Sequence, residues 1–215
     1  ATEPRETIPI SWAVSMRPDF CRVQKSQFPA GEDLALAILA SDATAARPTQ
    51  LVNFTGQYLG QPTQNMIVVG FGLTEKHTSG QKLYASVPIK SPLCDGVAES
   101  LHGCARGREV VLADKLGRVD TCGGDSGGPV YYRDTGQASG QQASGQSQSP
   151  ERWVLAAVTS RASAEALRVN SQVKCGPGGI YTLLGPAAMS WLCRWHGVAG
   201  FTVAGMSEPC AAVRP

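Results

Sequence analysis

The chain has 215 residues, of which 42% are hydrophobic and 17% are charged, and its formal net charge is +2. That length and composition suffice to bury a sizeable core, and the near balance of charge argues against nucleic acid or an anionic membrane as a partner. The 24 glycines and 14 prolines favour a fold with many turns, as in all-β proteins.

Seven cysteines are distributed along the chain, and none of them forms a CxxC pair. This spacing argues against a zinc ribbon and favours disulfides in an oxidising compartment, so the protein is expected to be secreted, into the extracellular space or a periplasm. We expect no metal and no cofactor. No apolar run reaches membrane-spanning length. The first residue is Ala and not Met, and no signal peptide is visible, so the chain is expected to be processed or cropped at its front.

Short strand-like runs recur in chain order and are separated by turn residues. Their spacing is typical of a β-barrel or sandwich and not of βαβ units. The runs are 8–14, 34–39, 66–69, 83–87, 110–112, 130–132, 153–159 and 180–184.

One segment predicts a helix, because Ala188, Trp191, Leu192 and Trp195 share one helical face after Pro186. Two other segments are poor in core residues. The polar, turn-rich stretch 41–65 is expected to link two halves of the fold. The stretch 133–152 contains GQASGQQASGQSQ and is expected to form a flexible loop between two strands.

The stretch TCGGDSGGPV at 121–130 suits a nucleophilic serine. A serine hydroxyl needs an adjacent base, and the oxyanion formed by its attack needs backbone N–H donors. Glycines let the backbone turn sharply, so the amides of Gly124 and Ser126 could converge on one oxygen, and Pro129 would end the turn. The alternative is a glycine-rich turn with an incidental serine, although the full GGDSGGPV string is far more specific than a DSG triplet.

GDSGGP at 124–129 resembles the active-site serine motif of the chymotrypsin/trypsin-like serine proteases. Further resemblances keep the family's order from about residue 10 to 197. They are MRPDF at 16–20 (family HPxY), DLALA at 33–37 (DIALL), MIVVGFG at 66–72 (the GWG strand), GIYT at 179–182 (GVYT) and WL at 191–192 in the terminal helix.

The resemblance implies an all-β, chymotrypsin-like double six-stranded antiparallel β-barrel with a C-terminal helix, in which the first barrel is incomplete. The implied protease domain spans 1–197 and is followed by a tail at 198–215. Its parts are a partial first barrel at 1–45, a linker at 46–65, a second barrel at 66–185 and the terminal helix at 186–197.

The resemblance also implies roles for single residues. Ser126 is the nucleophile, Asp33 orients the histidine, and the N–H groups of Gly124 and Ser126 form the oxyanion hole. Asp125 is the zymogen-type aspartate that pairs with the new N-terminus after activation. Asp120, six residues before the serine, forms the floor of the specificity pocket and favours Lys or Arg, although it could instead be a solvated loop aspartate.

The pocket walls are less regular. The pocket is expected to include Thr121, Thr159, Ser160, Arg161 and Gly179, and either Thr159 or Ser160 takes the place of the serine in the family's SWG pattern. If Arg161 replaces the wall glycine, it could narrow the entrance or pair with Asp120, which would weaken the preference for basic side chains.

The resemblance implies the disulfides Cys122–Cys175 and Cys94–Cys104, and Cys193 could pair with Cys210. A third disulfide common in the family would fall at Met66 and Tyr132, so neither of its two cysteines is present. Cys21 would have its partner outside the chain, and other pairings remain open.

The chain has three histidines, His77, His102 and His196, and none lies in an AAHC-like motif. Each is interpreted as a surface or loop residue. The chain is then a fragment of a longer polypeptide, one chain of a cleaved enzyme, or a natural truncation.

The leading hypothesis is a serine-type endopeptidase that cleaves after Arg or Lys through an acyl-enzyme and is inactive as this isolated chain. Its partners would be peptide or protein substrates and protein inhibitors. The alternatives are a non-catalytic protease homologue that binds a partner, and a disulfide-bonded β domain with no site.

Overall fold

The computed structural model describes most of the chain between residues 6 and 198. Most of the predicted flexible loop at 133–152 and of the tail at 198–215 lies outside the described residues, as do Cys21 and His196. The described residues are 6–19, 31–45, 48–52, 65–114, 116, 119–134, 152–169, 175, 177–195, 198 and 210.

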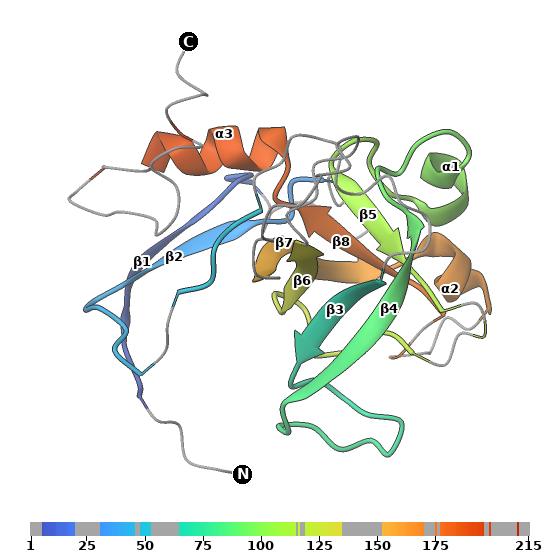
Figure 1. Ribbon diagram of the computed structural model, residues 1–215, viewed down its shortest axis with the longest axis horizontal. Coiled ribbons are helices and arrows are strands. Elements are labelled where there is room, and N and C mark those ends of the chain that lie inside the picture. The colour runs from blue at the N-terminus through green and yellow to red at the C-terminus, as the bar shows by residue number, and fades with distance from the viewer. Residues whose placement is uncertain are drawn as a thin grey trace, which may run out of the picture.

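Six strands form a closed antiparallel barrel, and each contains most of one run that the sequence predicts (Figure 1). Neighbouring strands follow the order β3-β4-β5-β8-β7-β6. Inward-facing apolar side chains from all six strands form the main core, which explains why these runs are rich in Val, Ile, Leu and Ala. The strands are β3 (Asn65–Gly70), β4 (Leu83–Ser91), β5 (Glu109–Leu112), β6 (Pro129–Asp134), β7 (Arg152–Ala162) and β8 (Gly179–Leu183).

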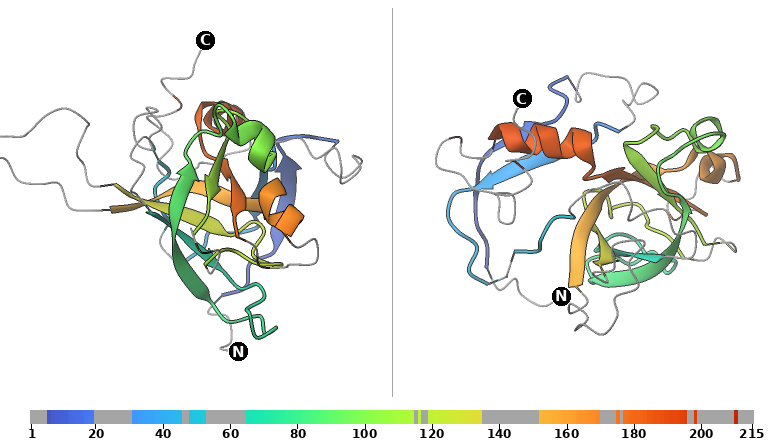
Figure 2. Two further views of the ribbon diagram at one scale, coloured as in Figure 1. Left: turned by 90° about the vertical axis from the view of Figure 1, so that its right-hand side faces the viewer. Right: turned by 45° about the horizontal axis from the view of Figure 1, so that its top comes forward.

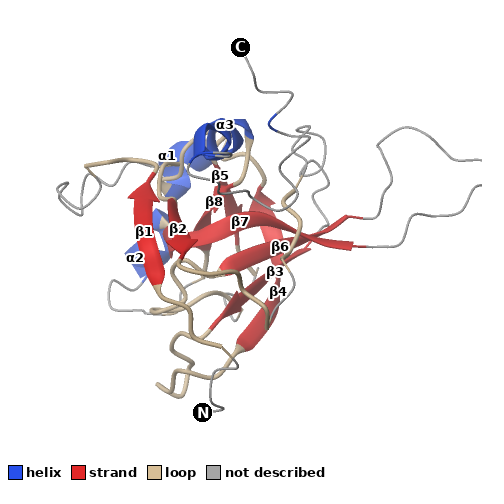
Figure 3. Ribbon diagram, turned by 90° about the vertical axis from the view of Figure 1, so that its left-hand side faces the viewer, coloured by secondary structure: helices blue, strands red, loops and turns tan. Residues whose placement is uncertain are grey.

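A two-stranded antiparallel sheet lies beside the barrel and consists of β1 (Ile10–Ser15) and β2 (Ala35–Leu39) (Figure 3). The terminal helix α3 (Pro186–Trp195) crosses this sheet, as the right-hand view of Figure 2 shows. The ring centroids of Trp12 in β1 and Trp195 in α3 are 5.4 Å apart, so the last turn of α3 packs against β1.

These features confirm the predicted all-β fold class with its C-terminal helix. Among the described residues, the second barrel is closed and the first is represented by β1 and β2 alone. No described helix is both long enough and apolar enough to cross a membrane.

Two short helices, α1 (Ala98–His102) and α2 (Ala164–Val169), were not predicted because neither is long enough to show helical periodicity. The left-hand view of Figure 2 shows them side by side. Their packing corrects the interpretation of His102 as a surface or loop residue. Its side chain is 3% exposed, and its Nδ1 lies 3.3 Å from a carboxylate oxygen of Glu165 in α2.

Three disulfides join described cysteines, and they are the expected pairs Cys94–Cys104, Cys122–Cys175 and Cys193–Cys210. At the site of the disulfide that the family often has and this chain lacks, Met66 and Tyr132 are both buried. The β3–β6 register, which pairs Ile67 with Tyr131, brings these two positions opposite each other. Apolar packing thus replaces the covalent link there.

Candidate active site

The glycine-rich stretch forms a tight loop that leads into β6, which begins at Pro129 as the sequence predicts. Gly124 and Gly127 have φ values of 98° and 81°, a region that favours glycine. The amide of Asp125 donates to the carbonyl of Cys122 over 3.1 Å, which closes the turn. Ser126 is an exposed residue of this loop.

The backbone amides of this loop differ in whether they are hydrogen-bonded within the protein. The Gly127 amide donates to the carbonyl of Thr159 over 2.9 Å, and the Thr159 amide donates to the carbonyl of Gly128 over the same distance. Within the described part of the chain, no hydrogen-bond acceptor is recorded for the amides of Gly124 or Ser126. These are the two groups that an oxyanion would need as donors.

Asp33 is tied to the same loop through β7. Its Oδ2 accepts a hydrogen bond of 2.7 Å from the hydroxyl of Ser160. Ser160 is the extra residue of a β-bulge, because Thr159 faces Tyr181 in β8 while Arg161 already faces Ile180. Bulges next to active sites redirect side chains, and this one directs Ser160 to Asp33. Of the two candidates for the serine of the SWG pattern, Ser160 is therefore the one in contact with the aspartate.

Arg161 does not pair with Asp120, which the sequence left open. Its guanidinium binds the carboxylate of Glu109 with two hydrogen bonds of 2.7 and 2.9 Å. Glu109 is fully buried at the start of β5, and a buried charge needs a partner of opposite charge. Across the β7–β8 ladder, Arg161 faces Ile180 and Ala162 faces Gly179.

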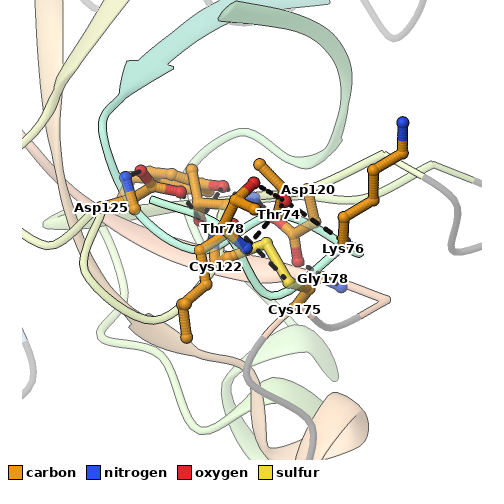
Figure 4. The surroundings of a disulfide bond; sticks show 12 residues. Thr74, Lys76, Thr78, Asp120, Cys122, Asp125, Cys175 and Gly178 are labelled. Carbon is orange, nitrogen blue, oxygen red and sulfur yellow. Dashed lines mark hydrogen bonds between the residues drawn. A yellow bond between two sulfur atoms is a disulfide. The ribbon is translucent and has the colours of Figure 1, made fainter. Parts of the chain in front are cut away.

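Asp120 is a largely buried carboxylate and not a solvated loop residue. Its Oδ1 accepts from the amide of Thr121 over 2.8 Å and from the hydroxyl of Tyr181 over 2.9 Å. Its Oδ2 accepts from the amide of Gly178 over 2.8 Å. Burial raises the pKa of Asp120 from 3.8 to about 6, and the three hydrogen bonds oppose that rise. Figure 4 shows Asp120 beside Gly178 and the disulfide of Cys122.

The carboxylate of Asp125 links the serine loop to the backbone at the end of β3. Its two carboxylate oxygens accept from the amides of Gly72 and Cys122 over 2.7 and 2.8 Å. A Cβ on Gly72 would lie 2.6 Å from one of these oxygens, so this close approach requires glycine. Asp120 and Asp125 both line a cavity of about 250 Å³ that extends under the β3–β4 turn.

Sequence reasoning missed two residues of this site. Tyr181 lies within the GIYT segment, but its place in the site follows only from its hydrogen bond to Asp120. Glu109 gave a signal that could have been used, because it is a single acidic residue at the head of the apolar run EVVLA, where burial requires a partner.

Neither of the two described histidines has a hydrogen bond or ion pair with Asp33. His77 is an exposed residue of the β3–β4 turn with a φ of 57°, and His102 belongs to α1. The part of the chain that the structure describes holds no group of three or more His, Cys, Asp or Glu side chains arranged for a metal ion.

A closed antiparallel barrel with an exposed serine in a glycine-rich loop, and a carboxylate tied to that loop, defines the chymotrypsin-like class of proteins. The family model Trypsin matches residues 16–163, which is more than half of the chain. The chain belongs to the trypsin family of serine proteases. The matched region includes Asp33, Asp120 and Ser126 and ends before Gly179. No curated protein sequence matches the chain.

Proposed function

We propose that this chain belongs to a serine endopeptidase that cleaves peptide bonds after Arg or Lys. One observation carries the proposal. Ser160 in β7 donates to Asp33, and its neighbour Thr159 accepts from Gly127 in the loop of the exposed Ser126. The amides of Gly124 and Ser126 have no acceptor among the described residues. Acyl transfer needs these parts around a nucleophile, together with a general base.

In the proposed reaction, a general base takes the proton of Ser126 as Oγ attacks the scissile carbonyl carbon. The carbonyl oxygen becomes an oxyanion and accepts hydrogen bonds from the amides of Gly124 and Ser126. Collapse of the tetrahedral intermediate breaks the C–N bond, and the protonated base gives its proton to the leaving amine. Water then attacks the acyl-enzyme by the same steps and releases Ser126.

The base is proposed to be a histidine outside these 215 residues, supplied by another segment of the parent polypeptide. Asp33 would accept the N–H of that imidazole with its remaining lone pairs and stabilise the imidazolium. The position of the described histidines, in the β3–β4 turn and in α1, supports this assignment. The isolated chain is therefore expected to be inactive.

Asp120 is proposed to select basic side chains. A guanidinium or ammonium that reaches Asp120 finds a partly desolvated carboxylate, so charge pairing there is stronger than in water. Binding of the cation would also return the pKa of Asp120 from about 6 toward lower values, because the cation favours the ionised form.

Asp125 is proposed to bind the new N-terminus of the activated enzyme. Its carboxylate lines the cavity beside the β3–β4 turn, and an amine there would be fixed by charge pairing. Secretion is a further part of the proposal, supported by three disulfides and by the family, whose members act on peptide or protein substrates and meet protein inhibitors.

The test uses the gene product that contains this chain together with its neighbouring segments. Hydrolysis of Arg and Lys peptide esters is measured beside that of neutral analogues, for the parent protein and for Ser126→Ala and Asp120→Asn. We expect no activity from Ser126→Ala and a loss of the preference for basic side chains in Asp120→Asn. Activity that survives Ser126→Ala would defeat the proposal.

The second candidate is a non-catalytic homologue that binds a partner, which the absence of a described histidine near Asp33 favours. A fluorophosphonate label separates the two functions, because stoichiometric modification of Ser126 in the native protein requires a base nearby. A native, folded gene product that leaves Ser126 unlabelled would favour the binding module.

A further inference from the structure

Glu109 connects elements that are far apart in the sequence. Its side chain is 0% exposed, and each of its two oxygens accepts two hydrogen bonds. One oxygen accepts from the amide of Gly31 over 2.8 Å and from Arg161 over 2.7 Å. The other accepts from the amide of Ala105 over 2.7 Å and from Arg161 over 2.9 Å. A buried carboxylate with four hydrogen bonds fixes the positions of the two amides and the guanidinium that donate to it.

Arg161 extends this connection to Asp33. The nitrogen that binds Glu109 over 2.7 Å also donates to the Oγ of Ser160 over 3.1 Å. A guanidinium can only donate, so Ser160 is an acceptor in that contact and its single proton is free to point elsewhere. That proton lies on the 2.7 Å hydrogen bond to Asp33. The Glu109–Arg161 ion pair therefore determines the direction in which the Ser160 hydroxyl donates its proton.

The backbone before Asp33 is held by the same carboxylate. Glu109 accepts the amide of Gly31, two residues before Asp33. Arg108, the residue before Glu109, pairs with Glu32 over 2.8 Å. This contact is exposed, and among the described residues the Arg108 side chain makes no hydrogen bond to Ser160. Glu109 thus acts on Asp33 from two directions, through the backbone of Gly31 and through the hydroxyl of Ser160.

We propose that Glu109 and Arg161 are positioning residues for the catalytic aspartate, which fix the direction of the Asp33 carboxylate toward the base. Neither residue touches the reacting atoms. The inference rests on the proposed function, since it assigns a role in orienting a base. It explains why an arginine stands directly after Ser160 although it does not face the pocket floor.

The test is a double-mutant cycle in the gene product that contains this chain, with kcat and KM measured on an Arg peptide ester. Arg161→Met is expected to lower kcat about 10-fold with KM nearly unchanged. That decrease corresponds to the loss of about one charged hydrogen bond. In a Ser160→Ala background the same change should have an effect of less than about 2-fold, because the route to Asp33 is already cut. Arg161→Lys should recover part of kcat.

Arg108→Met is the matched control, because it removes an arginine that pairs with the neighbour of Asp33 but does not reach Ser160. It is expected to leave kcat within about 2-fold of the parent, as for an exposed ion pair. Independent, multiplicative effects of Arg161→Met and Ser160→Ala would overturn the inference. An unchanged kcat in Arg161→Met would do the same.

A structural readout separates this inference from the proposed function. If Ser126 is neither active nor labelled, the proposed function fails, and crystal structures of the present chain still decide the positioning role. The Ser160 Oγ to Asp33 Oδ2 distance is expected to exceed 3.5 Å in Arg161→Met and to stay near the original 2.7 Å in Arg108→Met. Retention of the contact in both variants would overturn the positioning role.

Discussion

Replacement of Asp120 by Asn is expected to remove a large pH dependence of stability. The pKa of Asp120 is about 6 in the folded chain, against a reference value of 3.8. The folded state therefore binds the proton more tightly than the unfolded chain, so the stabilisation is fully present below pH 4 and is lost as pH rises through 6. A difference of about 2 pKa units at ~1.4 kcal/mol per unit amounts to roughly 3 kcal/mol.

The assay is urea unfolding of the present chain with its disulfides intact, at pH steps from 3.5 to 7.5. The quantity is the free energy of unfolding of the parent minus that of Asp120→Asn. We expect this difference to fall by roughly 3 kcal/mol between the ends of the range. The fixed cost of the Asn amide, whose N–H₂ would face the donor of Gly178, shifts the whole curve but not its slope.

Tyr181→Phe provides the matched variant. Its lost hydroxyl donates to the carboxylate of Asp120, so its removal should raise that pKa further and shift the same transition to higher pH. Parallel stability curves for the parent and Asp120→Asn would refute the reasoning. So would a transition in Tyr181→Phe that moves to lower pH.

Three further predictions concern stability. Replacing both Cys122 and Cys175 by Ser opens a link with a sequence separation of 53 and should cost about 4 kcal/mol in urea unfolding, whereas a loss below about 1 kcal/mol would contradict the chain-entropy argument. Gly72→Ala brings a Cβ to 2.6 Å from the Asp125 carboxylate and should lower the free energy of unfolding by roughly 1–3 kcal/mol; an unchanged melting temperature would count against this contact. Burial lowers the pKa of His102 below 6.5, so its contribution is present above pH 6.5 and is lost as pH falls through the folded value. His102→Gln should flatten that part of the pH profile, and equal slopes in the two proteins would speak against it.

The sequence predicted the strands and the long helix well because their signals are local. Runs of Val, Ile, Leu and Ala between Gly- and Pro-rich turns mark strands, and the spacing of Trp191, Leu192 and Trp195 marks one face of α3. It missed α1 and α2 because five or six residues carry too little periodicity. The buried state of His102 was missed for the same reason, since its burial depends on the packing of α1 against α2.

The sequence alone determined which residues could form an acyl-transfer site. GGDSGGPV combines a nucleophile, glycines that can adopt backbone conformations other residues avoid, and a proline that can end a turn, and each is a property of the residues themselves. Only the tertiary structure decided how the charges pair. Arg161 binds Glu109, Ser160 binds Asp33, and Asp120 is held by Tyr181, because these partners are distant in sequence and barrel closure brings them together.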